Sequence, residues 1–137
     1  MIRAVTENGG MMGFSLYAHH LKDKTECTLE SFCQMVADAA DKFGVQHFGL
    51  GSDLCQDQPD SIVEWMRVGR WTKTIDYGEG SAAAPGFPPQ PHWFETNRDF
   101  GNIETGLAAV GFGPDDVEAL MGGNWYRFFG ENFGALA

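Results

Sequence analysis

The sequence predicts an α/β fold with parallel strands, and three observations lead to this fold class. Two short apolar runs, MMGFSLY at residues 11–17 and HFGLG at residues 47–51, are typical of strands that are covered on both faces. Between them, residues 28–43 carry apolar side chains at helical spacing. The order strand, helix, strand implies a parallel pair joined by a right-handed crossover.

The first element of the chain is predicted to be a short helical segment. Residues 2–8 look like the tail of a helix, ended by Gly9 and Gly10, because glycine commonly follows the last helical turn. A helix tail without a helix start suggests that a preceding part of the fold is missing.

The helix at residues 28–43 is the clearest element. Thr28 is a plausible N-cap, Glu30 lies in the first turn and Gly44 ends the helix. Its apolar stripe consists of Leu29, Phe32, Cys33, Val36, Ala37, Ala40 and Phe43. We therefore expect one side of this helix to be buried.

The second half of the chain is predicted to be mostly helical, around a long loop. Asp60 can cap a short helix from Ser61 to about Trp71. The Gly- and Pro-rich residues at about 72–101 predict a long irregular loop, and loops of this length tend to be functional or flexible.

Three helical segments are predicted after this loop. Asn102 can cap the first, and Pro114 suits the first position of the second. After Gly122 and Gly123, the aromatic stretch NWYRFFGENF predicts a last helix that packs in the core.

The sequence predicts too few strands to cover the predicted helices. Two strands cannot cover the apolar faces of about five helical segments, and a two-stranded sheet leaves both edges unpaired. We therefore interpret residues 1–137 as a single partial domain of a larger α/β assembly.

Charge and composition exclude several classes of function. The formal net charge of −10 repels phosphate backbones, so we expect no nucleic-acid partner. No apolar run approaches the roughly 20 residues that span a bilayer, and no signal peptide is visible, so we expect a cytoplasmic protein without a membrane partner. Three cysteines without a CxxC pair indicate reduced thiols.

Asp53 is the best candidate for a functional residue. It follows the apolar strand HFGLG, where α/β folds carry their chemistry, although a helix cap or a turn is the alternative. His19 and His20 follow the first strand, but adjacent histidines point in different directions and make a poor chelate. We therefore prefer to interpret them as a loop pair.

Three stretches together resemble one family. GVQHFGLGSDL at residues 44–54, followed by MGGNWYRFF at residues 121–129, resembles the C-terminal part of the membrane (renal) dipeptidase family of zinc peptidases. ENGGMMGFSLY at residues 7–17 resembles the strand that precedes them in that family. The resemblance implies the C-terminal portion of a (β/α)8 TIM barrel, with about the last two β/α units plus C-terminal helices.

The resemblance also implies a site and a cofactor. The complete family enzyme binds two zinc ions, and Asp53 would be both a metal ligand and a catalytic group that assists proton transfer from the attacking water. The other metal ligands, and the arginine that grips the substrate carboxylate, belong to strands that this chain lacks. Asn124 and Arg127 match the family's GGNxxR stretch, and we assign them a structural role.

Two hypotheses for function follow. In the first, the chain is the C-terminal fragment of a zinc-dependent dipeptidase-like amidohydrolase, which hydrolyses dipeptides or small amides when complete and is inactive as a fragment. In the second, it is a non-catalytic interaction or structural module that forms a homo-oligomer or pairs with a missing N-terminal part. Both predict that the isolated chain associates or exposes apolar surface.

Overall fold

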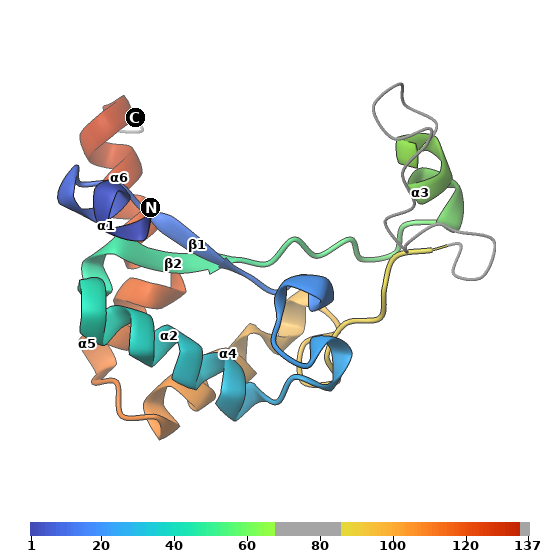
Figure 1. The fold of residues 1–137 in the computed structure, drawn as a ribbon, viewed down its shortest axis with the longest axis horizontal. Helices are drawn as coiled ribbons and strands as arrows, with labels where there is room; N and C mark the ends of the chain where they lie inside the picture. Colours follow the sequence, from blue (N-terminus) through green and yellow to red (C-terminus); the bar gives the residue numbers. More distant parts are fainter. Residues whose placement is uncertain (68–85, 135–137) are drawn as a thin grey trace.

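The computed structural model describes residues 1–67 and 86–134, which form an α/β fold around a two-stranded parallel sheet (Figure 1). In chain order the main elements are α1 (Ile2–Glu7), β1 (Met12–Ser15), α2 (Leu29–Phe43), β2 (Phe48–Gly51), α3 (Asp60–Arg67), α4 (Phe100–Ala109), α5 (Pro114–Glu118) and α6 (Asn124–Phe133). Shorter helical turns join them, namely η1 (Ala18–His20), η2 (Lys24–Glu26), η3 (Val45–His47), η4 (Asn97–Asp99) and η5 (Ala119–Gly123). In these described residues, no helix combines the length and the apolar character needed to cross a membrane.

The two strands pair in parallel, as the sequence predicted. Their register joins Met12 to Phe48 and Ser15 to Gly51, and α2 connects the end of β1 to the start of β2. Both strands are shorter than the predicted runs, because η1 follows β1 closely and η3 takes up the three residues before β2.

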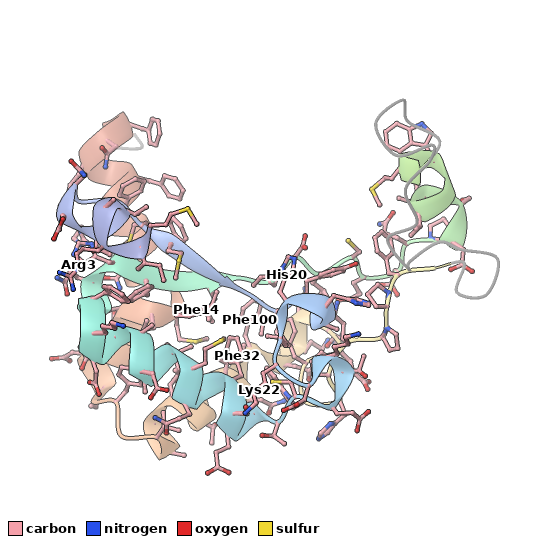
Figure 2. All side chains as sticks on the ribbon, in the orientation of Figure 1. Arg3, Phe14, His20, Lys22, Phe32 and Phe100 are labelled. Atoms are coloured by element: carbon pink, nitrogen blue, oxygen red, sulfur yellow. The ribbon has the colours of Figure 1, made fainter. Side chains whose placement is uncertain are left out.

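One face of the sheet packs against α2. Successive side chains of a strand point to opposite faces, and Phe14 and Phe48 share the face toward this helix. Phe14 meets Phe32 of α2 edge to face, with 6.4 Å between the ring centroids (Figure 2). Phe32 and Phe48 are fully buried, so this face forms the centre of the core.

The opposite face of the sheet carries glycines and lies under α6. Gly13 and Gly49 are register partners, and the indole of Trp125 lies over both of them. A Cβ added to Gly13 would lie 3.3 Å from Trp125 Cζ2, and one added to Gly49 would overlap the indole Nε1. A side chain larger than hydrogen therefore does not fit at Gly49, and one at Gly13 would be in tight contact with the ring.

The core extends from the sheet to α2 and α4. A Cβ added to Gly106 of α4 would lie 2.7 Å from Cys33 Sγ of α2, so these helices approach closely. The predicted stripe on α2 is confirmed at its centre, where the buried residues are Phe32, Cys33, Val36 and Ala40. Thr28 caps this helix as predicted, since its side chain accepts a hydrogen bond from the backbone N–H of Ser31 over 3.1 Å.

The predicted start of α4 is wrong. The helix begins at Phe100, so Asn102 lies inside it instead of capping it. The chain turns into the helix through η4, where Thr96 and Asp99 form a capping box. The Nδ2 of Asn102 instead donates a hydrogen bond of 2.8 Å to the Trp93 carbonyl oxygen, which ties α4 to the preceding loop.

Helix α3 stands apart from the other described elements, at the end of two extended segments (Figure 1). It begins at Asp60, which is its first residue instead of its cap. The rest of the predicted helix, to about Trp71, and the first part of the predicted loop fall in residues 68–85, outside the described residues. At the start of α3, the Asp60 carboxylate lies so close to Gly86 that a side chain at position 86 would overlap it.

The C-terminal helices begin as predicted but are less buried than predicted. Pro114 is the first residue of α5, and the wider turn η5, which contains Gly122, leads into α6. The prediction that α6 packs in the core is wrong for its outer half, because the Phe129 and Phe133 side chains are 44% and 76% exposed. The expectation that the isolated chain associates or exposes apolar surface stays a prediction.

Candidate functional site

Asp53 lies beyond the carboxyl end of β2. The strand ends at Gly51, and the Asp53 side chain is exposed two residues further on. It does not cap the next helix, because α3 begins only at Asp60. Catalytic groups of α/β folds gather at this end of parallel strands. The position therefore leaves the carboxylate accessible to a ligand.

The backbone at Asp53 is left-handed. Its φ is 51°, and Asp57 has a φ of 57°. For a residue with a Cβ this conformation costs roughly 1–2 kcal/mol, although aspartate adopts it more readily than most residues. Backbone conformations of this kind concentrate at functional sites, which favours a functional interpretation of this loop.

Asp53 borders a cleft of about 340 Å³ beyond the ends of the two strands. The first wall is formed by a residue that follows β1 in the sequence, and the second by residues that follow β2. The third wall is formed by the segment that precedes α4. The lining residues are Tyr17, Asp53, Leu54, Cys55, Gln56, Asp57, Phe87, Pro88, Gln90, Glu95 and Thr96.

The cleft offers negative charge and hydrogen-bond acceptors. Asp53, Asp57 and Glu95 line it, whereas none of the described lining residues is Lys, Arg or His. Gln90 Oε1 is buried in the lining and has no hydrogen-bond partner in the described structure. Because buried acceptors are nearly always paired, this oxygen leaves a position for a donor. The cleft therefore favours a cation or an N–H group over an anion.

Cys55 is an exposed thiol close to Asp53. The slight burial of the Cys55 thiol raises its pKa above that of a free cysteine, and the negative charge of Asp53 raises it further. Cys27 and Cys33 are buried free thiols, and burial raises the pKa of Cys33 to about 11. The three cysteines are unpaired in the structure, and their reduced state stays a prediction from the sequence.

The histidines after β1 do not belong to the cleft lining. His20 Nδ1 lies 3.1 Å from Ser15 Oγ, close to the end of β1 (Figure 2). The rings of His19 and His20 pack against Tyr17, with centroid distances of 5.6 and 5.1 Å. Since Tyr17 does line the cleft, this arrangement agrees with a loop pair that supports one wall.

The residues at this site do not fit a zinc ion without further ligands. The described residues contain no group of three or more His, Cys, Asp or Glu side chains that could hold a metal ion. Zinc sites in proteins use three or four protein ligands. Asp53 is the carboxylate that the sequence predicted as a metal ligand, and it is not joined by the others that such a centre requires.

The residues Asn124 and Arg127 have the structural role that we assigned to them. Asn124 Nδ2 donates hydrogen bonds of 2.9 Å to the carbonyl oxygens of both Val45 and Phe48. Arg127 Nη2 donates one of 2.7 Å to the Gln46 carbonyl oxygen. These bonds fasten α6 to the segment that leads into β2 and then to Asp53.

A larger hollow, of about 770 Å³, lies elsewhere, between α4, α5 and η5. Glu104 and Glu118 line it together with mainly apolar residues. Volume would favour this hollow as the site. The position of Asp53 at a strand end favours the smaller cleft, because catalytic groups of α/β folds lie at that end of parallel strands.

Of the lining residues, Asp53 is the one that the sequence predicted as a site residue, and three of the others show why the rest were missed. Tyr17 follows β1 as Asp53 follows β2, so the same argument about strand ends would have found it. Gln90 and Glu95 belong to an irregular segment, and no periodic pattern in the sequence indicates where such a segment lies relative to the strands.

Comparison by sequence finds no matching family model and no matching curated protein. By structure, the chain is similar to an amidohydrolase from Pseudomonas aeruginosa known from a crystal structure, with a TM-score of 0.81 and 20% sequence identity. The match covers 98% of this chain and 39% of the other. The chain therefore has the fold of one part of an amidohydrolase and spans well under half of that protein's length.

Proposed function

We propose that this chain is the C-terminal part of a zinc-dependent, dipeptidase-like amidohydrolase with a (β/α)8 barrel. Strands β1 and β2 would be the last two of the eight. The observation that carries the proposal is the exposed carboxylate of Asp53 at the carboxyl end of a parallel strand, in a fold that matches an amidohydrolase over 98% of the chain. Barrel enzymes keep their catalytic groups at this end of the strands.

Asp53 would act as the acid–base group of amide hydrolysis. Its carboxylate can accept the proton of the attacking water and pass that proton to the leaving amine. The exposed position supports this role, because a proton carrier must reach both the water and the substrate.

A dipeptide or a similar small amide suits the chemistry of the cleft. The carboxylates that line the cleft, from Asp53, Asp57 and Glu95, would attract the ammonium group of a dipeptide. Gln90 Oε1 can accept a hydrogen bond from an amide N–H of the substrate. We expect the enzyme to act in the cytoplasm, a prediction that rests on the sequence.

The family that the sequence resembles uses two zinc ions, and in the complete barrel Asp53 would be one of their ligands. A single carboxylate binds zinc weakly, because it must displace water without help from a preformed cage. We therefore expect that the purified chain binds no stoichiometric zinc and shows no dipeptidase turnover.

A second candidate function is a non-catalytic module that associates with itself or with a missing N-terminal part. The exposed side chains of Trp65, Tyr126 and Phe133, each more than 70% exposed, favour it. The zinc content of the chain combined with its missing part separates the two candidates, since only the hydrolase requires zinc.

The test begins with the coding region directly upstream of Met1. An open frame that encodes an H-x-D pair and the missing histidines supports the hydrolase. The chain expressed together with that region should then bind two zinc ions and hydrolyse dipeptides. A complete barrel that binds no zinc, or that leaves a panel of dipeptides intact, would contradict the proposal.

A further inference from the structure

We propose that the hollow between α4, α5 and η5 is a second binding site, and that its ligand is a small primary amine with an apolar body. We call it the amine hollow. The lining residues that carry the argument are Glu104, Ala108, Phe112, Val117, Glu118 and Met121. Among the described lining residues it shares none with the cleft at Asp53, so this inference goes beyond the proposed function.

The first wall of the amine hollow is the exposed side of α4. Ile103 and Leu107 are fully buried on the side of this helix that faces the core. Glu104 and Ala108 come one residue later in each case, lie one helical turn apart and are exposed. This wall therefore places a carboxylate next to a small apolar side chain.

The second wall is formed by α5 and η5. Glu118 is exposed, Met121 is half-buried and Val117 is buried, and all three line the hollow. Phe112, in the turn between α4 and α5, is half-buried and adds an aromatic ring to the lining. Its backbone N–H donates a hydrogen bond of 3.2 Å to the Leu107 carbonyl oxygen, which holds the turn against α4. This wall therefore also combines one carboxylate with apolar side chains.

The charges of the two walls favour a cation. Among the described residues, neither the Glu104 nor the Glu118 carboxylate has a hydrogen-bond or ion-pair partner, and none of the described lining residues is Lys, Arg or His. Two carboxylates at one hollow repel each other and attract positive charge. The net charge of −10 on the chain strengthens this attraction.

The size and the apolar lining favour an organic cation over a metal ion. The volume of about 770 Å³ lies within the range of small-molecule sites, about 300–1,000 Å³. Two carboxylates fall short of the roughly six to eight oxygen ligands that calcium takes, and a metal ion would leave Phe112 and Met121 uncovered. A primary amine with an apolar body can pair its ammonium group with the glutamates and cover these side chains.

A second copy of this chain suits the hollow less well, because two chains that each carry a net charge of −10 repel each other. Figure 1 shows α4 and α5 on the side of the sheet that α2 covers. Since elements of this chain form both walls, the site can be tested on residues 1–137 alone.

An NMR titration with phenylbutylamine tests the site. The methionine methyl groups of the chain would carry a carbon-13 label, so that Met121 reports on the hollow and Met35, exposed on α2, serves as the reference. Phenylbutanol and phenylbutyrate keep the apolar body and replace the ammonium group by a hydroxyl or a carboxylate. We expect the amine to shift the Met121 signal and to bind about 10-fold or more tightly than the alcohol, because it gains a charge-assisted hydrogen bond. Phenylbutyrate should bind most weakly.

Four variants separate charge from shape. Glu104→Gln and Glu118→Gln should each weaken the binding of the amine and leave that of the alcohol unchanged. Glu7→Gln, at the exposed end of α1, removes the same charge outside the hollow and should change neither. Ala108→Trp should abolish the binding of both probes, because the larger side chain fills the hollow from the α4 wall.

Equal affinities for the amine and the alcohol, equal effects of the three Gln variants, or no shift at Met121 would overturn the proposal. A Met121 signal that moves with protein concentration instead of with the amine would assign the hollow to a second copy of the chain and would overturn it too. None of these measurements depends on hydrolysis, so their failure would leave the proposed function unaffected.

Discussion

The indole Nε1 of Trp125 donates a hydrogen bond of 3.1 Å to the carbonyl oxygen of Leu50, across 75 residues of sequence. The same ring lies over Gly49, so one side chain both covers the strand and binds its backbone. Since Asp53 follows three residues after Leu50, the last helix of the chain supports the strand that presents the candidate catalytic carboxylate.

Gly49→Ala should destabilise the chain. The added methyl group would overlap the Trp125 indole, and overpacking of this kind costs typically about 1–3 kcal/mol. The free energy of unfolding, measured by urea denaturation, should fall by that amount. Gly101→Ala is the matched control, because position 101 lies in α4 and an added Cβ meets no atom within 4 Å. Equal effects of the two substitutions would contradict the packing of Trp125 on β2.

Asn124→Ala should also lower the free energy of unfolding, by about 1–3 kcal/mol, because it removes the donor to two carbonyl oxygens next to β2. Asn132→Ala is the control, since Asn132 is exposed and its Nδ2 bonds only within α6, to the Phe128 carbonyl oxygen. Urea denaturation should show a change below about 0.5 kcal/mol for this surface position. A loss at Asn132 as large as at Asn124 would count against the anchoring role.

Asp53→Asn should make Cys55 react faster with iodoacetamide at a given pH. Burial and the charge of Asp53 both raise the pKa of the Cys55 thiol and so disfavour the thiolate, which is the reactive form. Removing the charge lowers this pKa, so the thiolate fraction at pH 8 rises and the pH profile of alkylation moves to lower pH. Mass spectrometry of the labelled peptides distinguishes Cys55 from the buried Cys27 and Cys33.

Glu30→Gln serves as the control for this measurement. It removes the same charge from an exposed position in the first turn of α2. We expect its alkylation profile to match that of the unmodified chain. If both variants moved the profile equally, the cause would be net charge, and the assignment of part of the raised Cys55 pKa to the charge of Asp53 would be contradicted.

The sequence predicted the parts of the fold that depend on periodic patterns. The apolar stripe on α2 and the two apolar runs predicted the parallel pairing of β1 and β2. That pairing in turn predicted that Asp53 lies at the carboxyl end of a strand. The contact between Gly49 and Trp125 could not be predicted, because a glycine in a strand carries no sign of what covers it. The start of α4 was also missed, since Asn102 has the residue type of a cap but bonds to the preceding loop instead.

The sequence could predict only those site residues that directly follow a strand. Asp53 follows β2, and its exposed position agrees with the pattern of an apolar run that ends in a carboxylate. The acceptor Gln90 Oε1 and the carboxylate of Glu95 come from an irregular segment, whose path depends on tertiary packing such as the hydrogen bond from Trp93 Nε1 to the Cys27 carbonyl oxygen.

The central claim, that Asp53 carries the proton in amide hydrolysis, is tested most directly by kcat and KM for a dipeptide in the complete barrel with Asp53→Asn. This change keeps the shape of the side chain and removes the proton acceptor, so kcat should fall by about 10²-fold or more. KM should change less, because the arginine that grips the substrate carboxylate in the resembling family lies on another strand. Asp38→Asn, at an exposed position on α2, should leave both constants unchanged. Near-normal turnover by the Asp53→Asn barrel would contradict the account.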